Sequence, residues 1–283
     1  MGGDAASRTD DPILAAARAF ERDRYLTALR VQGDARGDLL TLAAFFAELQ
    51  RIPAFVNEPM MGEIRFQWWR DAVVSGASGG HPIADAVADV VHRRRLLATD
   101  IERLLDAMRL RLDDQPFATP DDLEQHLAAT EGAVFHLTAM CLEAPRDDET
   151  VAACARAGVA YGLARVAIEL PAVLAQGRTL APKDVTAKFG IETLDSAPRE
   201  ASGALQTAPW FALRRHLADR ARAEAAAAKS ALHRLPKAVR TACRPLAMVA
   251  PYSGLIRRLS AGDGLAVADV LPMTRLWRIW RGI

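Results

Sequence analysis

Apolar residues recur three or four positions apart along almost the whole chain, which is the spacing of one face of an α-helix. Several of these helices have recognisable starts. Proline suits the first helical turn, so Pro12, Pro59, Pro82 and Pro120 predict starts, and Asp34 opens a further helix. No segment shows the alternation of apolar and polar residues that is typical of a β-strand. The pattern therefore predicts an all-α protein.

The second half of the chain carries the longest helical patterns. They cover residues 149–174, 211–234, 236–259 and 273–280. Pro171 in the first of these segments, and Pro245 and Pro251 in the third, predict kinks or breaks. Because no internal repeat or low-complexity linker interrupts the chain, we expect one domain of about ten helices over residues 1–283, with residues 1–10 disordered.

The composition is that of a folded globular protein, with 51% hydrophobic and 25% charged residues. The longest stretches without a charged residue, Ala72–Ala84 and Ala201–Leu213, have 13 residues each. A membrane-spanning helix needs about 20 apolar residues, so none is expected. The first residues include Asp4, Arg8 and Asp10 and do not resemble a signal peptide. A cytoplasmic location is therefore expected.

Cysteine and histidine patterns give no sign of a metal site. Cys141, Cys154 and Cys243 lie within apolar helical patterns and form no CxxC pair, so buried free thiols are expected. The six histidines form no HExxH motif, which argues against a zinc enzyme.

The net charge of +1 conceals an asymmetry along the chain. Residues 211–283 hold 14 Arg or Lys and 4 Asp or Glu, a local charge of +10, which leaves −9 for the first 210 residues. Such a basic quarter fits peripheral contact with anionic lipid headgroups, on the inner face of a membrane, or contact with an acidic partner. It is equally typical of a solvated helix surface. No nucleic-acid partner is expected.

The most specific stretch covers residues 42–74 and reads LAAFFAELQRIPAFVNEPMMGEIRFQWWRDAVV. It predicts two helices that meet between the two prolines of the sequence RIPAFVNEP. On the second helix Glu63 and Arg70 are seven positions apart and share one face, beside Trp68 and Trp69. The two charges predict either a structural pair between helices or part of a polar site.

This stretch resembles the squalene/phytoene synthase superfamily, in which an aromatic helix runs into an Asp-rich DDxxDEP motif and a WR-containing helix follows. With Glu58-Pro59 set on the EP of that motif, Ala44, Phe45 and Ala47 are identical to the family pattern. A second segment, Gly158–Pro182, reads GVAYGLARVAIELPAVLAQGRTLAP and is similar to the second conserved helix of the family. The resemblance implies an isoprenoid-synthase-like helical bundle around a central cavity.

In the synthases that this chain resembles, two Asp-rich motifs hold Mg²⁺ against substrate diphosphates. The aspartate positions of the first motif fall here on Pro53, Ala54 and Asn57, and the pair of the second falls on Glu169 and Val173. Proline and valine supply no side-chain oxygen for Mg²⁺. Both motifs are therefore degenerate, and we expect no catalytic residues, no bound metal and no cofactor, with Mg²⁺ required only if the protein is an active enzyme.

Other charged residues are candidates for the lining of a remaining cavity. They are Glu58, Glu63, Arg65, Arg70, Tyr161 and Arg165. A structural network of ion pairs is the favoured interpretation of this set. The adjacent acids at 113–114, 121–122 and 147–148 are expected in loops or helix caps rather than at a metal.

The departures from the family pattern match a degenerate branch that includes the mitochondrial assembly factor for respiratory complex I. The resemblance implies a non-catalytic protein that assists assembly of the membrane-bound complex, with a complex I subunit or an isoprenoid as its partner. Two alternatives remain open. One is a prenyl diphosphate transferase with a rebuilt site, and the other is a metal-independent protein that binds an isoprenoid or another lipid.

Overall fold

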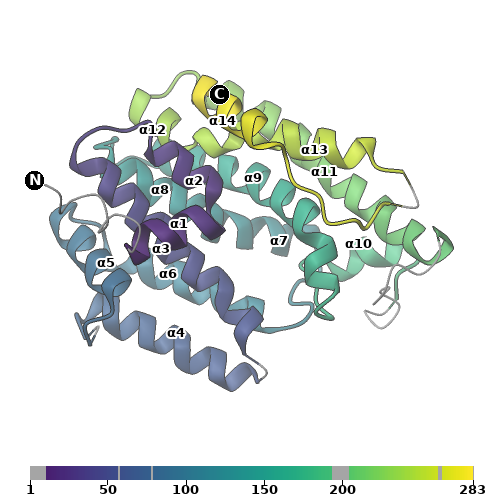
Figure 1. Ribbon diagram of the computed structural model, residues 1–283, viewed down its shortest axis with the longest axis horizontal. Coiled ribbons are helices and arrows are strands. Elements are labelled where there is room, and N and C mark those ends of the chain that lie inside the picture. The colour runs from purple at the N-terminus through teal and green to yellow at the C-terminus, as the bar shows by residue number, and fades with distance from the viewer. Residues whose placement is uncertain (1–10, 57, 78, 193–203, 261–262, 283) are drawn as a thin grey trace, which may run out of the picture.

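The computed structural model describes residues 11–56, 58–77, 79–192, 204–260 and 263–282, and every regular element within these ranges is helical (Figure 1). The predicted all-α class is therefore confirmed. The expectation for residues 1–10 and the motif position Asn57 lie outside the described residues.

The first half of the chain forms six α-helices. They are α1 (Pro12–Phe20), α2 (Arg22–Ala28), α3 (Asp34–Phe55), α4 (Pro59–Val74), α5 (Pro82–Arg93) and α6 (Ala98–Arg109). Each predicted proline start is confirmed. At α1 the Asp11 carboxylate also accepts a hydrogen bond from the Ile13 amide at 2.9 Å, which caps the helix.

The second half continues the bundle with longer helices and short irregular turns. They are η1 (Leu110–Leu112), α7 (Pro120–Leu127), the π-helical turn η2 (Ala128–Gly132), α8 (Ala133–Cys141), α9 (Asp148–Leu174), α10 (Lys183–Lys188), α11 (Ala204–Leu232), α12 (Lys237–Ala242), η4 (Arg244–Met248), α13 (Val249–Arg258) and α14 (Pro272–Arg281). Thr119 and Asp122 form a reciprocal capping box at the start of α7. Asp122, one of the adjacent acids at 121–122, therefore serves a helix cap, as expected.

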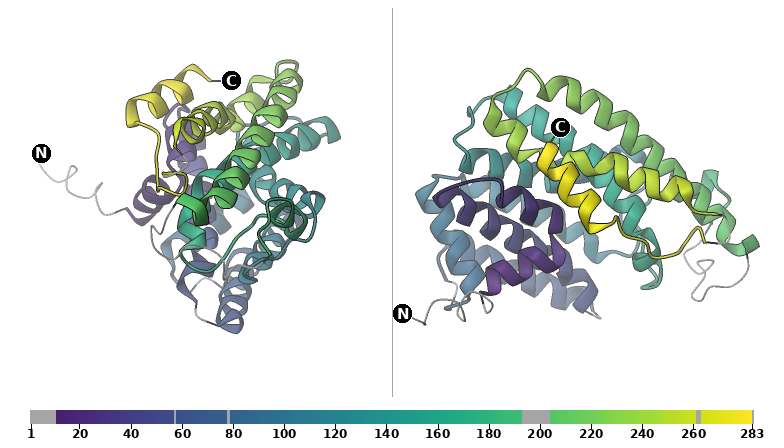
Figure 2. Two further views of the ribbon diagram at one scale, coloured as in Figure 1. Left: turned by 90° about the vertical axis from the view of Figure 1, so that its right-hand side faces the viewer. Right: turned by 45° about the horizontal axis from the view of Figure 1, so that its top comes forward.

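The long helix α9 is the central element, and it packs against α11, α8 and α13 (Figure 2). Its length and composition would suit a membrane span, but 67% of its most apolar window is buried within the bundle, as in the core helix of a folded domain. Pro171 lies inside α9 without ending it. Gly158 permits close packing, because a Cβ at this position would lie 2.2 Å from the backbone nitrogen of Gly132.

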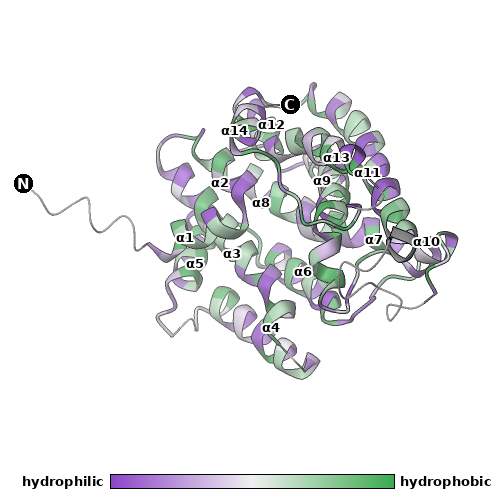
Figure 3. Cartoon of the chain, turned by 45° about the vertical axis from the view of Figure 1, so that its right-hand side comes forward, coloured by the Kyte–Doolittle hydropathy of each residue, from purple (hydrophilic) through white to green (hydrophobic). Residues whose placement is uncertain are grey.

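Most helices carry both apolar and polar residues around their circumference (Figure 3). All three cysteines are buried and unpaired, which confirms the prediction of free thiols. Cys154 and Cys243 pack against each other in the core, with their sulfur atoms 4.0 Å apart.

Two breaks interrupt the helical path of the chain. The first helix ends at Phe20, and Glu21 adopts φ −126° and ψ 52° before α2 begins. The segment 236–259 is split by the 3₁₀ turn η4, which contains Pro245, in agreement with the break expected there.

Candidate functional site

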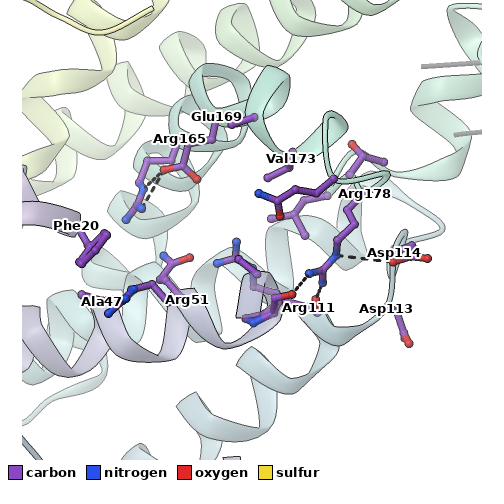
Figure 4. Close-up of a pocket in the computed structure, with 17 residues that line it drawn as sticks. Phe20, Ala47, Arg51, Arg111, Asp113, Asp114, Arg165, Glu169, Val173 and Arg178 are labelled. Atoms are coloured by element: carbon purple, nitrogen blue, oxygen red, sulfur yellow. Dashed lines mark hydrogen bonds and ion pairs between the residues drawn. The ribbon is translucent and has the colours of Figure 1, made fainter. Parts of the chain in front are cut away.

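A pocket of about 250 Å³ lies between the C-terminal end of α3 and the C-terminal half of α9 (Figure 4). Its wall contains Pro53, Glu169 and Val173, which are positions of the two degenerate motifs, together with Arg165. Two segments more than a hundred residues apart in sequence therefore face a common space, as the family resemblance implies.

The described wall of this pocket does not fit a magnesium site. Pro53 and Val173 have no side-chain oxygen, and the Glu169 carboxylate is bound by Arg165, whose Nη2 lies 2.9 Å from Glu169 Oε1. Among the residues that the structure describes, no group of three or more His, Cys, Asp or Glu side chains could hold a metal ion. Mg²⁺ needs several oxygen ligands in near-octahedral geometry, which these side chains do not offer.

Arg165 instead joins a buried network of ion pairs. Its Nη1 lies 2.6 Å from Glu21 Oε1 and 3.3 Å from Glu131 Oε1. Arg24 binds the same two carboxylates, at 2.5 Å in the case of Glu21. Glu21 and Glu131 are 2% and 4% exposed, so the arginines compensate acids that are shielded from water. The fifth contact of the network is the pair between Arg165 and Glu169 described above.

The network fixes the charge of its members. Burial would lower the pKa of Arg165, but the carboxylates of Glu169, Glu21 and Glu131 outweigh burial and hold this pKa well above its ordinary value. Burial would likewise raise the pKa of Glu131, but Arg24 and Arg165 keep it below its ordinary value of 4.5. Arg165 and Glu131 are therefore both ionised at neutral pH.

Two backbone irregularities direct the acids of this network inward. Glu21 occupies the break between α1 and α2, where the chain changes direction. Glu131 lies in the π-helical turn η2, which inserts an extra residue into the helical path and turns its side chain toward the core. No glycine or proline lies beside Glu21, whereas the π-helical turn ends in Gly132.

A second pocket of about 310 Å³ adjoins the first, and the two share Phe20, Arg165, Glu169 and Ala172 in their walls. These side chains therefore divide one hollow into two compartments. Tyr161, a predicted lining residue, borders the second compartment. Each compartment is at or below the lower end of the 300–1,000 Å³ that small-molecule sites occupy.

The Tyr161 hydroxyl donates a hydrogen bond to the buried Asp23 carboxylate, with an oxygen–oxygen distance of 2.8 Å. Tyr252 donates to the same carboxylate at 2.6 Å, and Arg275 of α14 forms an ion pair with it. Burial and the nearby Asp23 charge raise the pKa of Tyr161 well above its ordinary value, so the phenol stays protonated. This cluster fastens α14 to α2, α9 and α13.

Arginines from the other wall complete the first compartment. Arg178 donates to the Pro53 carbonyl at 2.6 Å and to the Arg111 carbonyl, so it ties the end of α3 to η1 (Figure 4). Arg51 forms an ion pair with Glu48, with 2.8 Å between Arg51 Nη1 and Glu48 Oε1. The Arg111 guanidinium has no ion-pair partner among the described residues, and burial lowers its pKa. Although the wall also contains Asp113, Asp114 and Glu169, the Arg111 guanidinium offers a positive charge to an anionic ligand.

The structure places the candidates from α4 elsewhere. Glu63 pairs with Arg109 at 2.5 Å, and Arg70 pairs with Asp106, so both connect α4 to α6 in the manner of a structural pair. Arg65 borders a separate hollow beside the tryptophans of the WWR motif. Glu58 precedes α4, where it is exposed and forms no side-chain cap. Since α4 leads away from α9, none of these four residues reaches the pocket between α3 and α9.

Several wall residues have no motif that predicts their position. They are Phe20, Gln50, Arg111, Asp113, Asp114 and Gln176. Arg178 is different, because it belongs to the Gly-Arg pair that resembles the family pattern. The acid pair at 113–114 lies in the turn after η1, as expected for a loop.

The chain matches the sequence pattern of the squalene/phytoene synthase family over residues 17–278. It therefore belongs to the squalene/phytoene synthase family, and the resemblance to that family is confirmed. The fold agrees: the crystal structure of squalene synthase HpnC from Alicyclobacillus acidocaldarius superposes with a TM-score of 0.64 at 19% identity, covering 86% of this chain and 94% of that one.

Two kinds of curated relative are similar to this chain. NADH dehydrogenase (ubiquinone) complex I, assembly factor 6 of Bos taurus is 26% identical over 193 residues, which cover 67% of this chain and 58% of the relative. The bifunctional protein CrtB/UppS of Streptomyces coelicolor is 30% identical over 211 residues, covering 70% of this chain and 37% of the relative. The chain thus spans little more than half of the first relative's length.

Proposed function

We propose that this chain is a non-catalytic member of its family that assists assembly of a membrane-bound respiratory complex I, acting in the cytoplasm on a subunit of that complex. The observation that carries this proposal is the pocket wall, where Pro53 and Val173 stand at metal-motif positions and Glu169 is bound by Arg165. The relative that is named as a complex I assembly factor supports the same role.

Ionisation of an allylic diphosphate leaves negative charge on the departing diphosphate. A metal cluster that neutralises the departing diphosphate contributes several kcal/mol, and each 1.4 kcal/mol corresponds to about tenfold in rate. Described residues at the motif positions offer one carboxylate, and it is already paired. A reaction that depends on Mg²⁺ would therefore lose several orders of magnitude in rate here.

A gene deletion in the source organism tests the assembly role. We expect membranes of the deletion strain to contain less assembled complex I on native gels and to oxidise NADH more slowly. Plasmid-borne wild type should restore both, and a Val173→Ala variant should restore them equally, because this side chain supplies no metal ligand. A deletion strain with normal amounts of assembled complex would refute the proposal.

A second candidate function is metal-independent binding of an isoprenoid diphosphate or a similar anionic lipid. The Arg111 guanidinium, which lacks an ion-pair partner among the described residues and faces the pocket, favours this candidate. The Streptomyces relative, named as a CrtB/UppS protein, is consistent with it.

A thermal-shift titration with farnesyl diphosphate separates these functions. A ligand at about 100 times its dissociation constant adds roughly 2.7 kcal/mol of stability. Stabilisation without Mg²⁺ that disappears in an Arg111→Ala variant supports the lipid-binding function. Stabilisation that requires Mg²⁺ would support an active prenyl transferase with a rebuilt site and contradict the non-catalytic proposal.

A further inference from the structure

The outward face of α14 is apolar, which is unusual for a helix on the surface of a bundle. Met273, Trp277 and Trp280 are 74%, 48% and 58% exposed, while the opposite face buries Arg275 and Ile279 against the bundle. Figure 2 shows α14 on the outside of the molecule, where it packs on α2 and η4. A surface helix ordinarily turns its polar side outward.

Arginines border this apolar face. Arg278 and Arg281 each lie 5.2 Å from the centre of the Trp277 ring, and Arg30 lies 5.1 Å from that of Trp280. Within the described part of the chain, none of these three arginines has an acid at ion-pair distance. Burial and the nearby Arg278 charge lower the pKa of Lys229 on α11, so a further cation lies close to this face.

The face is held rigidly by contacts at both ends of α14. Arg275 forms its ion pair with the buried Asp23 carboxylate near the start of the helix. Arg244 donates to the carbonyls of Ile279 and Trp280, at 2.9 and 3.0 Å, and so caps the end. A hollow of about 610 Å³ runs beside the helix against α1 and α2, with Leu276 in its wall.

We propose that the outward face of α14, formed by Met273, Leu276, Trp277, Trp280 and the flanking Arg278 and Arg281, docks on the surface of a lipid bilayer that contains anionic lipids. Tryptophan side chains are favoured at the boundary between headgroups and acyl chains. Arginines beside them attract anionic headgroups. A helix that carries apolar and basic residues in this way lies in the plane of the interface.

Charge complementarity selects the bilayer over a second copy of this chain. Two copies that met through α14 would bring the same arginines together and repel each other. An anionic bilayer instead neutralises them while the tryptophans enter the interface. This inference rests on α14 and the charges around it, so it does not depend on the proposed assembly function.

Vesicle sedimentation with the full chain tests the inference. We expect the protein to sediment with vesicles of equal parts phosphatidylglycerol and phosphatidylcholine, but not with phosphatidylcholine alone. A double charge reversal, Arg278→Glu with Arg281→Glu, should lower binding at least about 20-fold, because each arginine near an anionic surface contributes about fivefold. Arg103→Glu on α6, where the side chain is 77% exposed, is the matched control and should bind normally.

Fluorescence quenching by brominated phosphatidylglycerol identifies the face that meets the bilayer. The chain has five tryptophans. Quenching should be lost in a Trp277→Phe/Trp280→Phe variant, which keeps the aromatic volume and the fold, and should persist in Trp68→Phe. Equal binding to both vesicle types, quenching that survives the double change, or a dimer in solution that the charge reversal dissociates would overturn the inference.

Discussion

Replacement of Arg165 by methionine is the most direct test of the buried network. The change keeps much of the side-chain volume but removes the cation that lies 2.6 Å from Glu21 and 3.3 Å from Glu131. Among the described residues, Arg24 would then be the one arginine left at ion-pair distance from both carboxylates. Removal of one partner from a buried ionic group costs about 3–5 kcal/mol, because an uncompensated charge is left inside. For a domain of this size such a loss lowers the melting temperature by about 6–20 °C.

The loss should depend on pH in a specific direction. In the wild type the pKa of Glu131 lies below its ordinary value of 4.5, so its contribution is present above that value and is lost as pH falls through the lowered pKa. In the variant, the charge of Arg165 no longer opposes the effect of burial on Glu131. The Glu131 carboxyl group therefore becomes neutral at a higher pH than in the wild type. The stability difference between the two proteins should therefore be largest near neutral pH and should shrink on acidification.

Circular dichroism melts of both proteins across this pH range measure the effect. The matched control is Arg103→Met, which breaks an exposed pair 3.8 Å long and should change stability by less than about 1 kcal/mol. A variant at Arg165 that melts like the wild type, or that is destabilised equally at every pH, would refute the reasoning.

Three further predictions concern other parts of the bundle. Asp23→Asn should cost about 3 kcal/mol in a denaturant titration, because it removes the buried one of the two carboxylates that pair with Arg275; unchanged stability would contradict that role. Gly158→Ala should lower stability by about 1–3 kcal/mol in the same assay, since its Cβ would meet backbone at 2.2 Å, whereas Gly254→Ala, with open space around it, should be neutral or stabilising. Val173→Asp should still bind no Mg²⁺ by calorimetry, because the neighbouring glutamate remains paired with an arginine; a measurable heat of binding would count against this account of the pocket.

Helix starts were predictable because their signals are local. Proline at the first turn predicted the starts of α4, α5 and α7 to the residue. In α7 the hydrogen bonds of Thr119 and Asp122 add a cap to that start. The break at Glu21 and the π-helical turn at Glu131 were not predictable. The acids at both positions pair with Arg165 of α9, which is 144 residues from Glu21 in sequence and on a different helix from Glu131.

In the candidate site, too, some positions could be predicted from the sequence and others could not. Pro53, Glu169 and Val173 could be assigned to one pocket because the family resemblance fixes which helices face each other. Helical spacing showed that Glu63 and Arg70 share a face, but it contains no information about which neighbour that face meets. The structure directs them to α6.

The Asp23 cluster has a consequence for the order in which the molecule is made. Its carboxylate on α2 is compensated by Arg275, which follows 252 residues later in the chain. During synthesis the acid therefore emerges from the ribosome long before its cation exists. Closing so long a loop is entropically costly, and contacts between distant residues form late. The nascent bundle should thus hold an incomplete polar centre until α14 arrives, which makes docking of α14 a late step in folding.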